Sequence, residues 1–148
     1  MRRFILDTNI CLTYIRGEPL YRQIENEHSL TNPDAIILIS VVTKAELLSL
    51  GMQRGWEHKK LEKLNKILNN LVVIDINEKD QALINAYSII DAFSQGKLKE
   101  KPLGLSARNM GKNDLWIAST AHVANATLIT TDKDFDHLNK TFISVIQY

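Results

Sequence analysis

Cysteine, proline and long apolar runs are scarce in this sequence of 148 residues. Cys11 is the single cysteine, which excludes an internal disulfide bond and a zinc site made of several cysteines, and which is typical of a reducing compartment. No apolar run reaches the roughly 18 residues of a membrane-spanning helix. Asp7 and Asn9 interrupt the apolar residues near the N-terminus, so we expect no secretion signal there. These absences predict a cytoplasmic protein.

A strong charge of one sign is also missing, because the formal net charge is only +1. Binding to nucleic acid would therefore depend on a local patch rather than on the field of the whole protein. Hydrophobic residues make up 45% of the chain and charged residues 24%, as in ordinary globular proteins. With no repeat, low-complexity tract or linker, the length predicts a single domain over residues 1–148.

Short apolar runs alternate with segments of helical spacing. The runs expected to be strands are 4–6, 35–39, 71–76, 127–129 and 142–146. Alternating strands and helices predict an α/β fold, with a central parallel β-sheet flanked by α-helices. In the helix expected after Ser40, the spacing predicts a buried stripe of Val41, Ala45, Leu48 and Met52. Asn77 is expected to cap a later helix.

Acidic residues stand where the expected strands end and where the expected helices begin. Asp7 and Asp132 follow strands, Glu46 lies soon after a strand, and Asp114 begins a late helix. Strand ends of a parallel sheet share one edge, so these four carboxylates are candidates for a common site. Clustered carboxylates repel one another unless they bind a cation, and oxygen ligands suit Mg²⁺ or Mn²⁺. Asp134 shares a face with Asp132 if the backbone there stays extended.

Four motifs in order resemble those of the PIN domain. They are Ile5-Leu6-Asp7-Thr8-Asn9, Ser40 to Glu46, Asn113-Asp114 with Ile117-Ala118, and Thr130 to Phe135. With its full length, the chain resembles the VapC-type ribonuclease toxins of bacterial toxin–antitoxin pairs.

This resemblance implies a PIN-like sheet with an acidic site for Mg²⁺ or Mn²⁺. Asp7 and Asp114 would be direct ligands of the metal, and Glu46 would bind it directly or through a water. Asp132 matches the fourth acidic position of the family, although Asp134 could fill that position instead. The side chains expected to hydrogen-bond these carboxylates into position are Thr8, Asn9, Ser40, Asn113 and Thr131. A small antitoxin and a second copy of the chain are the implied protein partners.

The segment 96–112 carries five basic residues and one acid, and it leads directly into Asp114. Such a loop is suited to hold an RNA backbone beside the acidic site, with Arg108, Lys101 and Lys112 as candidate phosphate contacts. A mobile, solvated loop explains the same composition.

The predicted function is a metal-dependent endoribonuclease that hydrolyses RNA phosphodiester bonds as the toxin of a toxin–antitoxin pair. One alternative is a PIN-fold RNA-processing nuclease without an antitoxin. Another is a catalytically silent PIN-like RNA-binding module, although clustered negative charges would hinder a protein that only binds phosphates. A phosphatase of the haloacid-dehalogenase type is disfavoured, because Asn9 stands where its second aspartate belongs.

Overall fold

The structure is a computed structural model that describes all residues, 1–148. Five parallel strands form one sheet in the order β3-β2-β1-β4-β5. Their bounds are β1 (Arg2–Leu6), β2 (Ala35–Ser40), β3 (Val72–Ile74), β4 (Thr127–Thr130) and β5 (Ser144–Gln147). The N-terminal strand is therefore the central one, and every expected strand is present with shifted ends.

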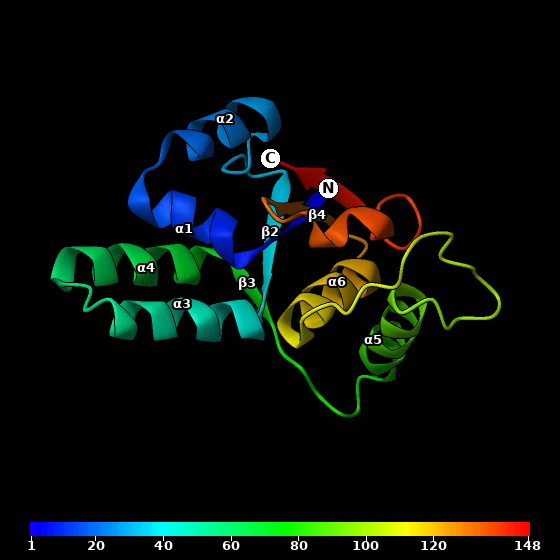
Figure 1. The fold of residues 1–148 in the computed structure, drawn as a ribbon. Coiled ribbons are helices and arrows are strands. Elements are labelled where there is room, and N and C mark those ends of the chain that lie inside the picture. Colours follow the sequence, from blue (N-terminus) through cyan, green and yellow to red (C-terminus); the bar gives the residue numbers. More distant parts are fainter.

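Helices cover both faces of the sheet (Figure 1). Four of them lie on one face: α1 (Thr8–Arg16), α2 (Pro19–His28), α3 (Val41–Gln53) and α4 (His58–Asn70). The other face is covered by α5 (Gln81–Ser94), α6 (Lys112–Ala124) and the short 3-10 helix η1 (Lys133–Leu138). The predicted α/β architecture, a parallel sheet between helices, is confirmed.

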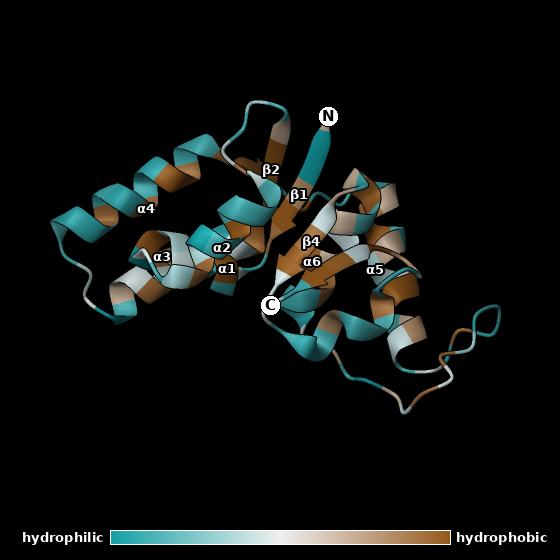
Figure 2. Ribbon diagram, turned by 90° about the horizontal axis from the view of Figure 1, so that it is seen from above, coloured by the Kyte–Doolittle hydropathy of each residue, from teal (hydrophilic) through white to brown (hydrophobic).

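The central strands β1 and β4 are mostly apolar along their buried parts, whereas β1 begins with two arginines near the surface (Figure 2). In β1, Phe4 and Leu6 pack into the cluster beneath α1–α4, whereas Ile5 packs into the cluster beneath α5 and α6. In β4, Leu128 and Ile129 divide between the two clusters in the same way. This alternation fixes the orientation of the residue that follows each strand, where the acidic residues stand.

Polar residues at the strand ends also begin the helices. The Asp7 carboxylate accepts a hydrogen bond from the Thr8 backbone N–H at 2.7 Å, and Ser40 Oγ accepts one from the Val42 N–H at 3.2 Å. These contacts satisfy N–H groups that have no partner within the helix. Asn77 does not cap α5 as expected. Asp80 does, by accepting a hydrogen bond from the Leu83 N–H, because α5 begins one turn later than the sequence suggested.

The buried stripe expected on α3 is wrong. Met52 is 82% exposed and Leu48 is 38% exposed, whereas Leu47 and Thr43 are fully buried. The reason is that α3 projects with α4 beyond the edge of the sheet (Figure 1). Only the beginning of α3 lies against the sheet, and the rest of the helix packs against other helices. Gly51 lies on the buried side, where a side chain would approach the Trp56 ring to 3.2 Å.

The direction in which the chain winds reverses between β1 and β4. From β1 the chain moves outward through β2 to β3, and it then crosses back to β4 and β5 on the other side. Open α/β sheets bind ligands at the carboxyl ends of strands at such a reversal. Asp7 directly follows β1, and Asp132 stands two residues beyond the end of β4. No helix in the structure is both long and apolar enough to cross a membrane.

Candidate metal centre

Asp7 is held by two hydrogen bonds at the end of β1. Its Oδ1 accepts from the Thr8 backbone N–H, and its Oδ2 accepts from the Thr130 hydroxyl at 2.7 Å. The carboxylate is buried, with 6% of the residue exposed. The register pairs Leu6 with Ile129, so the next residues along each strand, Asp7 and Thr130, lie opposite each other. The sheet itself therefore sets the orientation of Asp7.

Two successive hydrogen bonds between side-chain oxygens and backbone N–H groups hold the acids that follow β4. Thr130 Oγ1 accepts a hydrogen bond from the Asp132 N–H at 2.9 Å, and Asp132 Oδ1 accepts one from the Asp134 N–H at 2.9 Å. The condition of an extended backbone is not met, because Asp132 caps η1 and the backbone turns directly after it. The tight turn nevertheless brings Asp132 and Asp134 to the same side.

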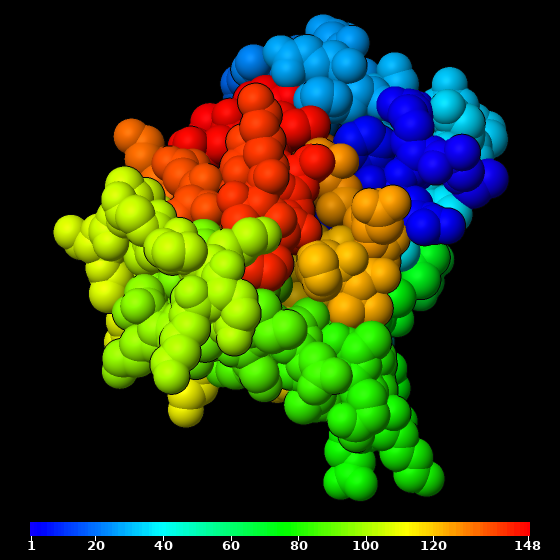
Figure 3. All heavy atoms as spheres, turned by 90° about the vertical axis from the view of Figure 1, so that its right-hand side faces the viewer, coloured from blue at the N-terminus to red at the C-terminus, as the bar shows by residue number.

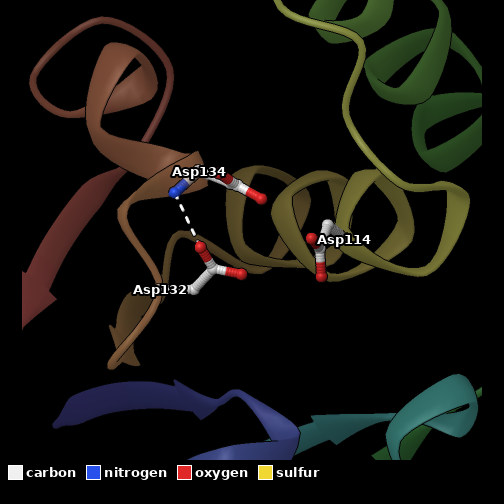
Figure 4. A group of neighbouring side chains, drawn as sticks. All are labelled: Asp114, Asp132 and Asp134. Atoms are coloured by element: carbon white, nitrogen blue, oxygen red, sulfur yellow. Dashed lines mark hydrogen bonds between the residues drawn. The ribbon is translucent and has the colours of Figure 1, made fainter.

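These two acids face Asp114, which stands in the first turn of α6 (Figure 4). One carboxylate oxygen from each of Asp114, Asp132 and Asp134 lies within 4.8 Å of the other two. Three carboxylates at this separation offer oxygen ligands to one divalent cation. Asp7 and Glu46 are not in this tightest group but border it.

Glu46, on α3, stands near Asp7 and α6. Burial raises the pKa of Glu46, the negative charge of Asp7 raises it further, and the neighbouring Thr8 and Asn113 side chains lower it. The Thr8 hydroxyl also lies 3.5 Å from that of Thr43, which joins α1 to α3 beside the site. Elements from four parts of the chain thus bring five acids together: Asp7, Glu46, Asp114, Asp132 and Asp134.

The electrostatics of the site are those of uncompensated negative charge. Burial raises the pKa of Asp114 to about 7, and repulsion by Asp7, Asp132, Asp134 and Glu46 contributes to the rise. Burial also raises the pKa of Asp7, although hydrogen bonds from Thr130 and Thr8 oppose that rise. None of the salt bridges in the structure involves any of the five acids. The five acids offer only oxygen atoms as ligands, and none of them is paired with a basic side chain. Such a group fits a hard divalent cation such as Mg²⁺ or Mn²⁺.

Two of the three basic residues predicted to contact RNA border this acidic site. Lys112 begins α6 and lines an open hollow of about 430 Å³ together with Asp114. Lys101 lies with its Nζ 4.8 Å from the centre of the Phe142 ring. Arg108 lines a second hollow, of about 360 Å³, together with Lys133 and Asp134. Lys112 and Arg108 thus border hollows that also contain acids of the site.

The PIN domain family model matches residues 4–141. The chain belongs to the PIN domain family. This finding confirms the resemblance inferred from the four sequence motifs.

Known proteins resemble the chain over nearly its whole length. It is 31% identical to Ribonuclease VapC2 of Rickettsia felis over 138 residues, which are 91% of each protein. Its structure is similar to VapBC2 of Rickettsia felis bound to a promoter DNA fragment, with a TM-score of 0.72, 27% identity and 98% of each chain covered. VapBC-1 from nontypeable Haemophilus influenzae gives a TM-score of 0.70 at 25% identity, covering 98% of this chain and 97% of that one.

Thr130 begins the fourth motif of this PIN domain, but the sequence assigned it no role in the site. The sequence favoured Thr131, but the hydroxyl that joins Asp7 to the Asp132 backbone belongs to Thr130. The pairing of β1 with β4 would have identified it, because Thr130 lies opposite Asp7 in that register. Among the other expected partners, Ser40 caps α3, and no hydrogen bond joins Asn9, Ser40 or Thr131 to a carboxylate of the site. The roles of those three residues stay predictions.

Proposed function

We propose that this PIN domain is a metal-dependent endoribonuclease and acts as the toxin of a toxin–antitoxin pair. The observation that carries the proposal is the convergence of Asp114, Asp132 and Asp134 within 4.8 Å, with none of the three in a salt bridge. A protein that only bound RNA phosphates would gain nothing from such a cluster. The 31% identity to a ribonuclease over 91% of the chain supports the same activity.

In this proposal Asp7, Glu46, Asp114 and Asp132 hold Mg²⁺ or Mn²⁺, and Asp134 is a further ligand. When bound, such a cation lowers the pKa of a water molecule and neutralises charge on the phosphoryl oxygens. Asp7 is oriented before binding by Thr130 and Thr8. Asp114, with a pKa of about 7, carries a proton in part of the molecules at neutral pH and must release it to become a ligand.

The groups around the acids complete the proposed machinery. Thr8 and Asn113 lower the pKa of Glu46 and so favour its charged, ligating form. Asn9, Ser40 and Thr131 are proposed to support the acids when RNA and metal are bound. Lys101, Arg108 and Lys112 are proposed to contact RNA phosphates, which would place the scissile bond beside Asp114.

The partners follow from the relatives. Two of the similar structures are VapBC2 and VapBC-1, and VapBC2 is bound to promoter DNA. We infer a cognate antitoxin that binds this chain, a second copy of the chain as homodimer partner, and action on RNA in the cytoplasm.

The proposal is tested by incubating the purified chain with mixed RNAs in the presence of Mg²⁺ or Mn²⁺. We expect cleavage that is abolished by a chelator and by Asp114→Asn. Cleavage that persists under both conditions would contradict the metal mechanism. Normal metal binding without cleavage of any RNA would instead support the silent RNA-binding module.

A separate experiment tests the antitoxin. Expression of the chain should arrest bacterial growth, and co-expression of a short reading frame that neighbours its gene should restore growth. Cleavage of RNA without any growth arrest would support an RNA-processing nuclease that has no antitoxin.

A further inference from the structure

The loop between α5 and α6, residues 95–111, returns to the body of the protein at Arg108. The Arg108 backbone N–H donates a hydrogen bond to the Ser94 carbonyl at 2.7 Å, at the end of α5. Figure 3 shows the loop spread over one face of the molecule beside the segment that follows η1. Arg108 is half-buried, whereas most of its neighbours in the loop are exposed. Its side chain therefore lies against the protein.

The Arg108 guanidinium contacts the short helix that carries the two acids. Its Nη1 donates a hydrogen bond to the Lys133 carbonyl at 3.3 Å and lies 3.3 Å from His137 Nδ1. Lys133 stands between Asp132 and Asp134. Arg108 thus binds the backbone of η1 at the residue between those two acids.

His137 extends this contact into the core. Its Nε2 lies 2.7 Å from Ser94 Oγ, and its ring stacks on Phe93 with the two planes 7° apart. Because a guanidinium has only donors, His137 Nδ1 accepts from Arg108, which leaves Nε2 to donate to Ser94. Burial lowers the pKa of His137, and the charge of Arg108 lowers it further, so the ring stays neutral as this arrangement requires.

The acids of η1 need such a restraint. Asp132 and Asp134 lie within 4.8 Å of Asp114, and like charges at this distance repel one another. η1 is a short 3-10 helix of six residues, a form with poorer hydrogen-bond geometry than an α-helix. Contacts from outside η1 must therefore oppose the repulsion when no cation is bound.

We propose that Arg108 is a positioning residue of the metal centre, which clamps η1 through the Lys133 carbonyl and His137 so that Asp132 and Asp134 face Asp114. This inference rests on the proposed function where metal binding and cleavage are concerned. It assigns Arg108 an action on the protein itself, in addition to the RNA contact proposed above. The two actions make different predictions for metal binding in the absence of RNA.

The clamp is tested first without metal or RNA, by hydrogen exchange of the Asp134 backbone amide, which donates to Asp132 Oδ1. Arg108→Ala should increase the exchange rate at Asp134 by at least 10-fold, whereas amides of β1 should keep theirs. Lys99→Ala is the matched control, since it removes one positive charge from the same loop at an exposed residue. Equal exchange at Asp134 in the wild type and Arg108→Ala would overturn the clamp. This result does not depend on whether the protein is a nuclease.

The second readout is the affinity for Mn²⁺ alone, measured by calorimetry. Groups that orient metal ligands typically change metal affinity 10- to 100-fold, so we expect Arg108→Ala to weaken binding about 10-fold and Lys99→Ala to leave it unchanged. Arg108→Lys should restore little, because a lysine lacks the planar fork of donors. Unchanged Mn²⁺ affinity in Arg108→Ala with a raised KM for RNA would overturn the clamp and leave only an RNA contact. Failure of the wild type to bind Mn²⁺ would reject the proposed function, while the exchange result still decides the clamp.

If Arg108→Ala does not fold, His137→Phe addresses the same contact. This variant keeps an aromatic ring to stack on Phe93 but removes the nitrogen that accepts from Arg108. We expect faster exchange at Asp134 and weaker Mn²⁺ binding, as for Arg108→Ala. Normal exchange and normal affinity in His137→Phe, together with the same result in Arg108→Lys, would overturn the proposal.

Discussion

The Thr130 hydroxyl donates a hydrogen bond of 2.7 Å to Asp7 Oδ2, although the two residues lie 123 positions apart in the sequence. The same hydroxyl accepts the Asp132 backbone N–H. One buried side chain therefore links the acid after β1 to the acids after β4, and it makes the two halves of the site a single unit.

Removing the Thr130 hydroxyl should lower the stability of the folded protein. Thr130→Val keeps the shape but leaves a buried carboxylate oxygen without its donor, so we expect a loss of about 1–3 kcal/mol in the free energy of unfolding. Urea denaturation of the metal-free protein measures this loss. Thr131→Val, one residue further along, should change stability by less than about 0.5 kcal/mol. Equal effects of the two substitutions would contradict the role assigned to Thr130.

The stability of the metal-free protein should depend on pH through Asp114. Its pKa is about 7 in the folded protein and lies near 3.8 in the unfolded chain, so the folded state binds the proton more tightly. The contribution of Asp114 is neutral below pH 4, and it becomes unfavourable as the pH rises from about 4 to 7. Asp114→Asn removes this cost, and we expect the variant to be more stable than the wild type by about 1–2 kcal/mol at pH 8. This is less than the free energy that corresponds to the whole pKa shift, because Asp114 is only half-buried and solvent screens its charge.

Unfolding in a chelator at pH 4 and pH 8 measures this difference. The variant must be compared with the wild type because His137 also contributes to the pH dependence. Its pKa is lowered in the folded protein, so its contribution to stability is lost as the pH falls, which is opposite to the effect of Asp114. A variant that is less stable than the wild type at pH 8 would show that the carboxylates do not repel one another as inferred.

Divalent cations should stabilise the folded protein through the same acids. Mn²⁺ at 100 times its Kd should add about 2.7 kcal/mol to the free energy of unfolding of the wild type. Asp132→Asn should reduce this gain more than Asp134→Asn, since Asp132 is half-buried and Asp134 is exposed. Thermal unfolding with and without Mn²⁺ compares the variants. A larger loss in Asp134→Asn would make Asp134 the principal ligand of the pair.

The two sides of α3 should respond differently to truncation. Leu47→Ala removes a fully buried side chain, and we expect it to cost about 2–5 kcal/mol. Met52→Ala alters a residue that is 82% exposed and should cost less than about 0.5 kcal/mol. Denaturant unfolding of both variants measures the contrast. A large loss in Met52→Ala would indicate that this surface is covered by another copy of the chain in solution.

The sequence was sufficient for the order of elements because the strands and helices differ in their apolar spacing and in their flanking polar residues. It was also sufficient to expect Asp7, Asp114 and Asp132 at one edge of the sheet, since they stand where strands end or helices begin, but their roles as metal ligands stay predictions. It was not sufficient for α3, because the spacing of apolar residues shows that a helix has an apolar side but not what covers it. Leu48 and Leu47 are equally apolar, and only the position of α3 beyond the sheet edge distinguishes them.

The finer geometry of the site depends on pairing between distant segments. The sequence offered Thr130 and Thr131 as neighbours of equal chemistry, and the choice between them follows from the register of β1 with β4. The relation of Asp132 to Asp134 depends on a 3-10 turn, which the sequence alone did not indicate. Arg108 was recognised as basic, but its contact with Lys133 and His137 joins segments 25 and 29 residues away.

The central position of β1 has a consequence for protein synthesis. β1 leads directly into Asp7, the first acid of the site, yet its neighbour β4 and the Thr130 hydroxyl are translated more than 120 residues later. A nascent chain can pair β1 with β2, but the other edge of β1 stays unpaired and the metal centre stays incomplete until residues 127–134 have left the ribosome. If the chain cleaves RNA, it becomes able to do so only after these residues have been made and have paired with the first strand.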